Sequence, residues 1–178
     1  PRGGDFTYSE SEIDLMVADI EMAKSLGVSG IVSGVLNSDH TLDIKNTRRL
    51  INAGAGLPFT FHRAFDWIPN KEEALGQLDD LGAQRILTSG GCAKAIDALE
   101  TLTTWNRNYH TTILPGGGIN SSNYKAFKTA GFEEIHLSAT KIIDKGEIEV
   151  SMNALKYLVE NGHILCDSKE VSIICKRG

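Results

Sequence analysis

The stretch LPFTFHRAFD, residues 57–66, shows the pattern that decides the fold. Its first half, Leu57–Phe61, has the length and apolar composition of a buried strand, and the polar cluster His62-Arg63-Ala64-Phe65-Asp66 follows at once. Four more short apolar runs end in the same way, at Ser33-Gly34, Thr88-Ser89-Gly90-Gly91, Pro115-Gly116-Gly117-Gly118 and Ser138-Ala139-Thr140. The runs begin roughly 22 to 29 residues apart, which is the length of one strand-plus-helix unit in a β/α barrel.

The segments between these runs carry helix signals. Ser9 with Glu12, and Asn70 with Glu73, have the spacing of a capping box, and Asp43 is suited to the position before a helix. We expect helices after these three residues, from Ala95 onward and around Tyr124–Phe127. They alternate with predicted strands at Val28–Leu36, Leu57–Phe61, Gln84–Leu87, Thr111–Leu114 and Glu134–Leu137.

Strands that alternate with helices form a parallel sheet in which every strand ends on the same side. A complete TIM (β/α)8-type barrel has about 250 residues, whereas this chain has 178 residues and five predicted strands. The sequence therefore predicts a single domain over residues 1–178 with one of two architectures. It is either an incomplete TIM-type barrel with about strands 4 to 8, whose first β/α units would precede Pro1, or an open doubly wound sheet.

The regular alternation of predicted strands and helices ends after Thr140. We expect Lys141–Val150 to form an excursion from the repeating units, and a helix to include Leu155, Leu158 and Val159. Asp167 and Glu170 have capping-box spacing and predict one last short helix.

Composition excludes several classes of protein. The net charge is -5 and the basic runs are no longer than two residues, so the sequence does not predict nucleic-acid binding. Its apolar runs are far shorter than the ~20 residues of a membrane span, and we expect a cytoplasmic protein. Cys92, Cys166 and Cys175 are too widely spaced to predict a disulfide scaffold or a zinc site. Cys92, at a predicted strand end, is interpreted as a small buried residue rather than a reactive thiolate.

His62, Arg63 and Asp66 are the candidate catalytic residues, because they directly follow a predicted strand. In this hypothesis His62 is a general acid or base, Arg63 binds an anion and Asp66 orients one of them. In the alternative interpretation Arg63 and Asp66 only pair with each other, while His62 bonds to a neighbouring backbone group.

Other residues at the predicted strand ends are candidates for binding an anionic ligand. The backbone of Gly116, Gly117 and Gly118 can approach a phosphate closely because no side chains intervene. We expect hydroxyl, amide or charged groups of Arg2, Asp5, Thr88, Ser89 and Ser138 to reach the same face, although Arg2 and Asp5 could instead form a local salt bridge. No residue of this chain is assigned as a metal ligand.

Four segments, PRGGDF (1–6), TFHRAFD (60–66), ILTSGG (86–91) and LPGGGI (114–119), together resemble the CutC family of copper-homeostasis proteins in order and spacing. The resemblance extends to about Ser138-Ala139. It implies a cytoplasmic TIM barrel that often self-associates and handles Cu(I), with the cysteines proposed as Cu(I) ligands in a region before Pro1.

Two functional hypotheses follow. The resemblance favours a copper-homeostasis protein that binds Cu(I), a soft metal that prefers thiolates. The residues at the strand ends favour a barrel enzyme that acts on a phosphorylated or carboxylated small molecule, with His62 as general acid or base. An interaction scaffold would not need such groups gathered on one face.

Overall fold

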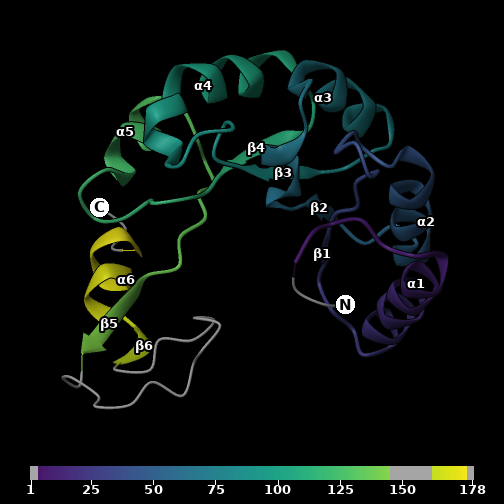
Figure 1. Ribbon diagram of the computed structural model, residues 1–178. Coiled ribbons are helices and arrows are strands. Elements are labelled where there is room, and N and C mark those ends of the chain that lie inside the picture. Colours follow the sequence, from purple (N-terminus) through teal and green to yellow (C-terminus); the bar gives the residue numbers. More distant parts are fainter. Residues whose placement is uncertain (1–3, 145–161, 176–178) are drawn as a thin grey trace.

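The computed structural model describes residues 4–144 and 162–175. Four strands form a parallel sheet in the order β1-β2-β3-β4: β1 (Ile31–Ser33), β2 (Phe59–Phe61), β3 (Arg85–Thr88) and β4 (Thr112–Pro115). Five α-helices alternate with them: α1 (Glu10–Ser25), α2 (Ile44–Gly54), α3 (Lys71–Asp80), α4 (Leu99–Asn108) and α5 (Tyr124–Thr129). In Figure 1 these helices follow an open arc on the outer side of the strands. The predicted parallel α/β architecture is confirmed.

The helix starts agree with the capping residues in the sequence. Ser9 accepts a hydrogen bond from the backbone N–H of Glu12, whose carboxylate accepts one from the backbone N–H of Ser9. The side chain of Asp43 accepts from the N–H of Asn46 at 2.9 Å, and Asn70 caps α3. Each side chain therefore satisfies a backbone donor that has no partner inside its own helix.

Two short 3-10 helices lie directly after strands or strand-end loops. The first, η1 (Arg63–Trp67), follows β2, and the second, η2 (Ala95–Ala98), leads into α4. The sequence predicts one helix from Ala95, and the structure divides it into η2 and α4. The tight turn of η1 holds Arg63 and Asp66 on the same side of the chain, since residues three apart are aligned in a 3-10 helix.

The predicted fifth strand, Glu134–Leu137, is reduced to one point of pairing. Gly116 and His136 form an isolated parallel bridge, and the N–H of His136 donates to the carbonyl of Pro115 at 2.8 Å. The direction and position of this segment agree with the prediction, but its length as a strand was wrong. The chain after it enters an antiparallel hairpin, so no crossover helix directly follows to hold the whole segment against β4.

That hairpin consists of β5 (Thr140–Asp144) and β6 (Gly162–Cys166), and α6 (Ser168–Cys175) follows it. The predicted excursion from Lys141 therefore starts as a strand, while its remainder and the predicted helix at Leu155–Val159 lie outside the described residues. Asp167 accepts from the N–H of Lys169 at 3.0 Å, as expected of a residue that begins a helix. The predicted capping box was wrong about Glu170, whose carboxylate instead contacts Ser121.

The core fills the space between the strands and the helical arc. Its fully buried members come from helices and strands throughout the sheet layer, and include Ile13, Leu50, Phe59, Phe61, Phe65, Leu75, Leu78, Ile86, Leu102, Ile113 and Phe127. In the described residues, no helix is both long and apolar enough to cross a membrane. Burial of these side chains is the main source of stability for the layer that carries the strand ends.

We expect Leu75→Ala to lower the free energy of unfolding by about 2–5 kcal/mol, because Leu75 is fully buried in α3 and the substitution leaves a cavity. Leu15→Ala is the matched control, since Leu15 lies on a helix but is 56% exposed, and we expect a change within about 0.5 kcal/mol. Urea unfolding monitored by circular dichroism measures both. Equal effects of the two substitutions would contradict the packing described above.

Candidate functional site

The ends of β2, β3 and β4 bring three of the predicted residues together. The Nη2 group of Arg63 donates to Ser89 Oγ at 2.8 Å. A Cβ atom placed on Gly117 would lie 3.4 Å from Arg63 Nη1 and 3.2 Å from Ser89 Cβ. Arg63, Ser89 and Gly117 therefore form one cluster at the carboxyl ends of three adjacent strands, which we call the strand-end site.

Asp66 ties β2 to β3 at this end of the sheet. Its carboxylate accepts hydrogen bonds from Thr88 Oγ1 and from the backbone N–H groups of Ser89 and Gly91. It also pairs with Arg63 Nε at 2.7 Å, and the side chain of Asp66 is only 8% exposed. These contacts indicate a positioning role for Asp66, since its acceptor capacity is directed to protein donors.

The ion pair between Arg63 and Asp66 agrees with the alternative interpretation of the sequence, but it does not use the whole guanidinium group. Nε faces Asp66 and Nη2 faces Ser89, whereas Nη1 lies next to Gly117 and has no acceptor within the described part of the chain. The Arg63 side chain is 45% exposed. A fixed guanidinium with one open edge is suited to an anionic ligand.

His62 lies beside the cluster, packed between the ends of β1 and β2. Its Nδ1 accepts from the N–H of Ala64 at 3.2 Å, and its ring centroid is 4.9 Å from that of Phe6. A Cβ atom on Gly34 would lie 2.7 Å from Nδ1, so only glycine leaves room for the imidazole. Burial lowers the pKa of His62, and acceptance at Nδ1 places the proton of the neutral ring on Nε2.

The glycine run after β4 exposes backbone donors next to Arg63. Gly116 N–H donates to the carbonyl of Thr88, and the carbonyl of Gly117 accepts from Ala95 N–H, each at 2.9 Å. The φ angles of Gly117 and Gly118 are +119° and +69°. Among the described residues their N–H groups have no acceptor, and backbone donors in such a turn are suited to bind an anion.

Lys94 is a residue of this site that the sequence interpretation missed. A Cβ atom on Gly118 would lie 3.1 Å from Lys94 Cγ, so the lysine side chain passes directly beside the glycine run. Lys94 immediately precedes η2 and is exposed. Its position directly before the predicted helix at Ala95 was the available signal, but only the fold shows that Gly118 is its neighbour.

Of the remaining candidate residues, some hold the strand-end site in place and the others lie outside it. Thr88 and Ser89 are fully buried and bond to Asp66, so they support the site from beneath. Ser138 lines a neighbouring cavity of about 390 Å³ that also includes Gly118. Asp5 Oδ1 accepts from the N–H of Thr7 in the turn before α1, and Arg2 lies outside the described residues.

The described residues do not provide a donor set that suits Cu(I). Copper(I) prefers soft thiolate ligands, but Cys92 is half-buried after β3, whereas Cys166 and Cys175 are exposed in β6 and α6. Within residues 4–144 and 162–175, no three His, Cys, Asp or Glu side chains are grouped so that they could hold a metal ion. The strand-end site is instead built from cations and backbone N–H groups.

Comparison with known proteins establishes the family. The sequence model described as the CutC family matches residues 1–141. The chain belongs to the CutC family. The resemblance noted in PRGGDF, TFHRAFD, ILTSGG and LPGGGI is thus confirmed.

Relatives in this family are similar over most of the chain. A CutC family protein from Enterobacter sp. (strain 638) is 42% identical over 142 residues, and one from Bacteroides fragilis is 44% identical over 150 residues. These matches cover 79% and 82% of this chain, but only 58% and 59% of the relatives. The chain therefore spans less than two thirds of the length of these CutC proteins.

A solved structure agrees with the fold. The crystal structure of a CutC protein from Streptococcus agalactiae, whose name refers to copper homeostasis, matches with a TM-score of 0.72 and 33% identity. The match covers 76% of this chain and 68% of the solved chain. The parallel α/β architecture of this CutC-family chain thus agrees with that of a solved relative.

The lowered pKa of His62 predicts a pH dependence of stability. The folded state binds this proton less readily than the unfolded state, so its contribution is complete above the usual pKa of about 6.5. Stability is lost as the pH falls from there toward the lower folded-state pKa. We expect urea unfolding between pH 7.5 and 5 to show a smaller decrease for His62→Gln than for the wild type. His110→Gln, an exposed histidine at the other end of the sheet, should keep the wild-type decrease.

Proposed function

We propose that the strand-end site binds a small molecule that carries a phosphate or carboxylate group. The observation that carries this proposal is the open edge of Arg63 next to Gly117, where the N–H groups of Gly117 and Gly118 have no acceptor among the described residues. An arginine and two backbone donors that lie next to one another are well suited to the oxygens of such a group. The aliphatic stem of Lys94 lies beside Gly118, which brings a second cationic side chain to the site.

The surroundings support binding because they fix the guanidinium before a ligand arrives. The carboxylate of Asp66 accepts from Arg63 Nε, and Ser89 Oγ accepts from Arg63 Nη2. Asp66 and Ser89 are themselves joined, because the backbone N–H of Ser89 at the end of β3 donates to the Asp66 carboxylate. A side chain that is already ordered loses less conformational entropy on binding. The strand-end site is therefore preorganised at Arg63.

We further propose that the sheet is part of a TIM-type β/α barrel and that the strand-end site lies at its mouth. Two features support the barrel over a doubly wound sheet. The helices α1 to α5 lie on one side of the strands in an open arc (Figure 1), and the Gly116–His136 bridge continues the sheet in the parallel sense. Ligands of such barrels bind at the carboxyl ends of the strands.

An enzymatic role for His62 is part of the same proposal. In the neutral ring Nδ1 accepts from Ala64, so Nε2–H is the group available to a ligand. This supports the neutral His62 ring as a hydrogen-bond donor to the ligand, whereas action as a general acid would require the imidazolium form, which burial disfavours. Action as a general base would require the other tautomer, with the proton on Nδ1 and the hydrogen bond from Ala64 given up.

Arg63→Gln tests the strand-end site. We expect the affinity for inorganic phosphate, or for the best ligand in a panel of sugar phosphates and small carboxylates, to fall about ten- to hundredfold, because a charged hydrogen-bond donor is lost. Isothermal titration calorimetry measures the affinity, and circular dichroism confirms that the variant is folded. Arg107→Gln, an exposed arginine on α4, is the charge-matched control and should bind as the wild type does. Unchanged binding by Arg63→Gln would refute the site.

A second candidate function is Cu(I) handling, which is favoured by the name of the solved relative. In this proposal Cu(I) is the cargo and the thiolates that bind it belong to a region before Pro1, as the family resemblance implies. Self-association and a cytoplasmic location are further expectations from the same resemblance.

Titration with Cu(I) against a competing Cu(I) chelator tests this assignment. We expect the 178-residue chain to release Cu(I) to the chelator, and Cys92→Ser to behave identically, because the described cysteines are not grouped. A chain that includes the residues preceding Pro1 should retain about one equivalent, since it would supply thiolates. Retention by the 178-residue chain that disappears in Cys92→Ser would overturn the proposed location of the ligands.

A further inference from the structure

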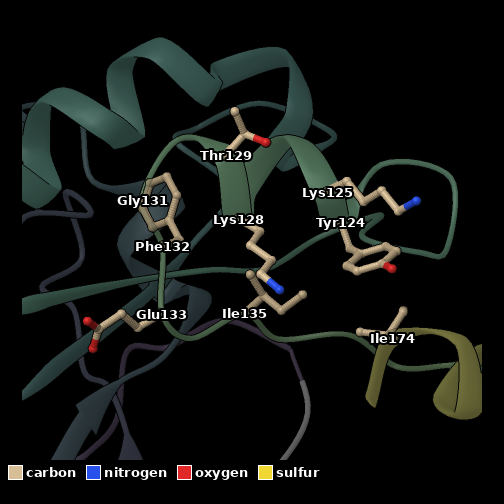
Figure 2. Close-up of a pocket in the computed structure, with 9 residues that line it drawn as sticks. All are labelled: Tyr124, Lys125, Lys128, Thr129, Gly131, Phe132, Glu133, Ile135 and Ile174. Carbon is tan, nitrogen blue, oxygen red and sulfur yellow. The ribbon is translucent and has the colours of Figure 1, made fainter. Parts of the chain in front are cut away.

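The C-terminal helix α6 rests on the rest of the fold with little apolar packing. None of its described side chains is buried, and Val171 and Ile173 are 38% and 48% exposed. Figure 2 shows Ile174 of α6 opposite Tyr124 and Lys128 of α5, across a cavity of about 800 Å³. A helix is usually stabilised by a buried apolar face, so α6 must be held by another interaction.

Glu170 supplies that interaction through hydrogen bonds to the loop after the glycine run. Its Oε2 accepts from the backbone N–H of Ser121 at 2.7 Å, and its Oε1 accepts from Ser121 Oγ at 2.6 Å. Both contacts are short and involve a carboxylate, so they are stronger than ordinary neutral hydrogen bonds. An internal anion thus already lies on the loop that follows the proposed anion-binding glycines.

This contact adjoins the strand-end site through a shared cavity. The lining of the cavity of about 390 Å³ includes Gly118, Asn120 and Ser138 together with Asp167 and Glu170. Gly118 also lies beside Lys94, and its neighbour Gly117 lies beside Arg63. Because Gly118 shares this cavity with the carboxylates of Asp167 and Glu170, a phosphate bound at Gly118 would be repelled by them.

We propose that α6 is a lid held closed by Glu170, and that a bound anion and the Glu170–Ser121 contact exclude each other. This inference rests on the proposed anion-binding function. The ligand anion on the glycine N–H groups repels the carboxylates, so Glu170 leaves Ser121 and α6 detaches, and the weak apolar packing of α6 makes this detachment feasible. In the absence of an anion the carboxylate returns to Ser121.

Two measurements on the whole 178-residue chain test the lid. Isothermal titration with inorganic phosphate compares the wild type with Glu170→Gln and with the matched control Glu100→Gln, an exposed residue of α4. We expect Glu170→Gln to bind phosphate about tenfold more tightly, because the competing charged hydrogen bonds are weakened. Hydrogen exchange at residues 168–175 should become faster when phosphate saturates the wild type, and should already be fast in Glu170→Gln without phosphate.

The outcomes separate the lid from the proposed function. Equal phosphate affinity for the wild type and Glu170→Gln, with exchange in α6 unchanged by phosphate, overturns the lid; if Arg63→Gln then still loses binding, the strand-end site stands. A gain in Glu170→Gln with no effect of Arg63→Gln refutes the strand-end site, and the lid that rests on this site is overturned with it. If no variant binds phosphate, the lid is overturned, and the carboxylate panel alone decides the proposed function.

Discussion

The network around the Asp66 carboxylate holds the functional end of this fold together. It accepts from the side chain of Thr88 and from two backbone N–H groups after β3, while Asp66 itself belongs to the turn after β2. A nearly buried carboxylate is stable only when several donors compensate for its lost hydration. The same network fixes Arg63, so the geometry of the cation depends on the contact that joins the two strands.

The glycine run after β4 joins the third strand end to the strands that Asp66 connects. Arg63 lies against the end of β4 beside Gly117, whose carbonyl accepts a hydrogen bond from the backbone N–H of Ala95 at the start of η2. Three strand ends are thereby connected through one carboxylate, one guanidinium and one backbone hydrogen bond. Charge is concentrated where the backbone is most accessible, as is common for the loops that carry function on a rigid α/β scaffold.

Much of the local structure could be predicted because its signals are local. Ser9, Asp43 and Asn70 cap helices as the sequence indicates, and the four strands of the sheet lie where the apolar runs are. The polar groups after β2, β3 and β4 could be assigned to one face because parallel strands end on the same side. These predictions required only periodicity, capping chemistry and the direction of the strands.

The errors concern contacts between residues distant in the sequence. Glu170 matches a capping pattern, but it accepts two hydrogen bonds from Ser121, and the backbone N–H of Asp167 donates to the carbonyl of Ala139 instead. Lys94 carries no motif and gains its place only when the end of β4 folds against the start of η2. The segment 134–137 has a strand sequence, yet the hairpin that follows leaves it with a single bridge. Tertiary neighbours decide each of these cases.

One detail of packing constrains how this protein can evolve. Gly34 does not adopt a left-handed backbone; its lack of a side chain matters because the imidazole of His62 occupies the space that a Cβ would need. The effect of a substitution at position 34 therefore depends on which residue is present at position 62. As long as histidine stands at 62, any replacement at 34 meets a steric barrier; a smaller residue at 62 removes the closest contact, while Phe61 Cζ would still lie 3.1 Å from a new Cβ.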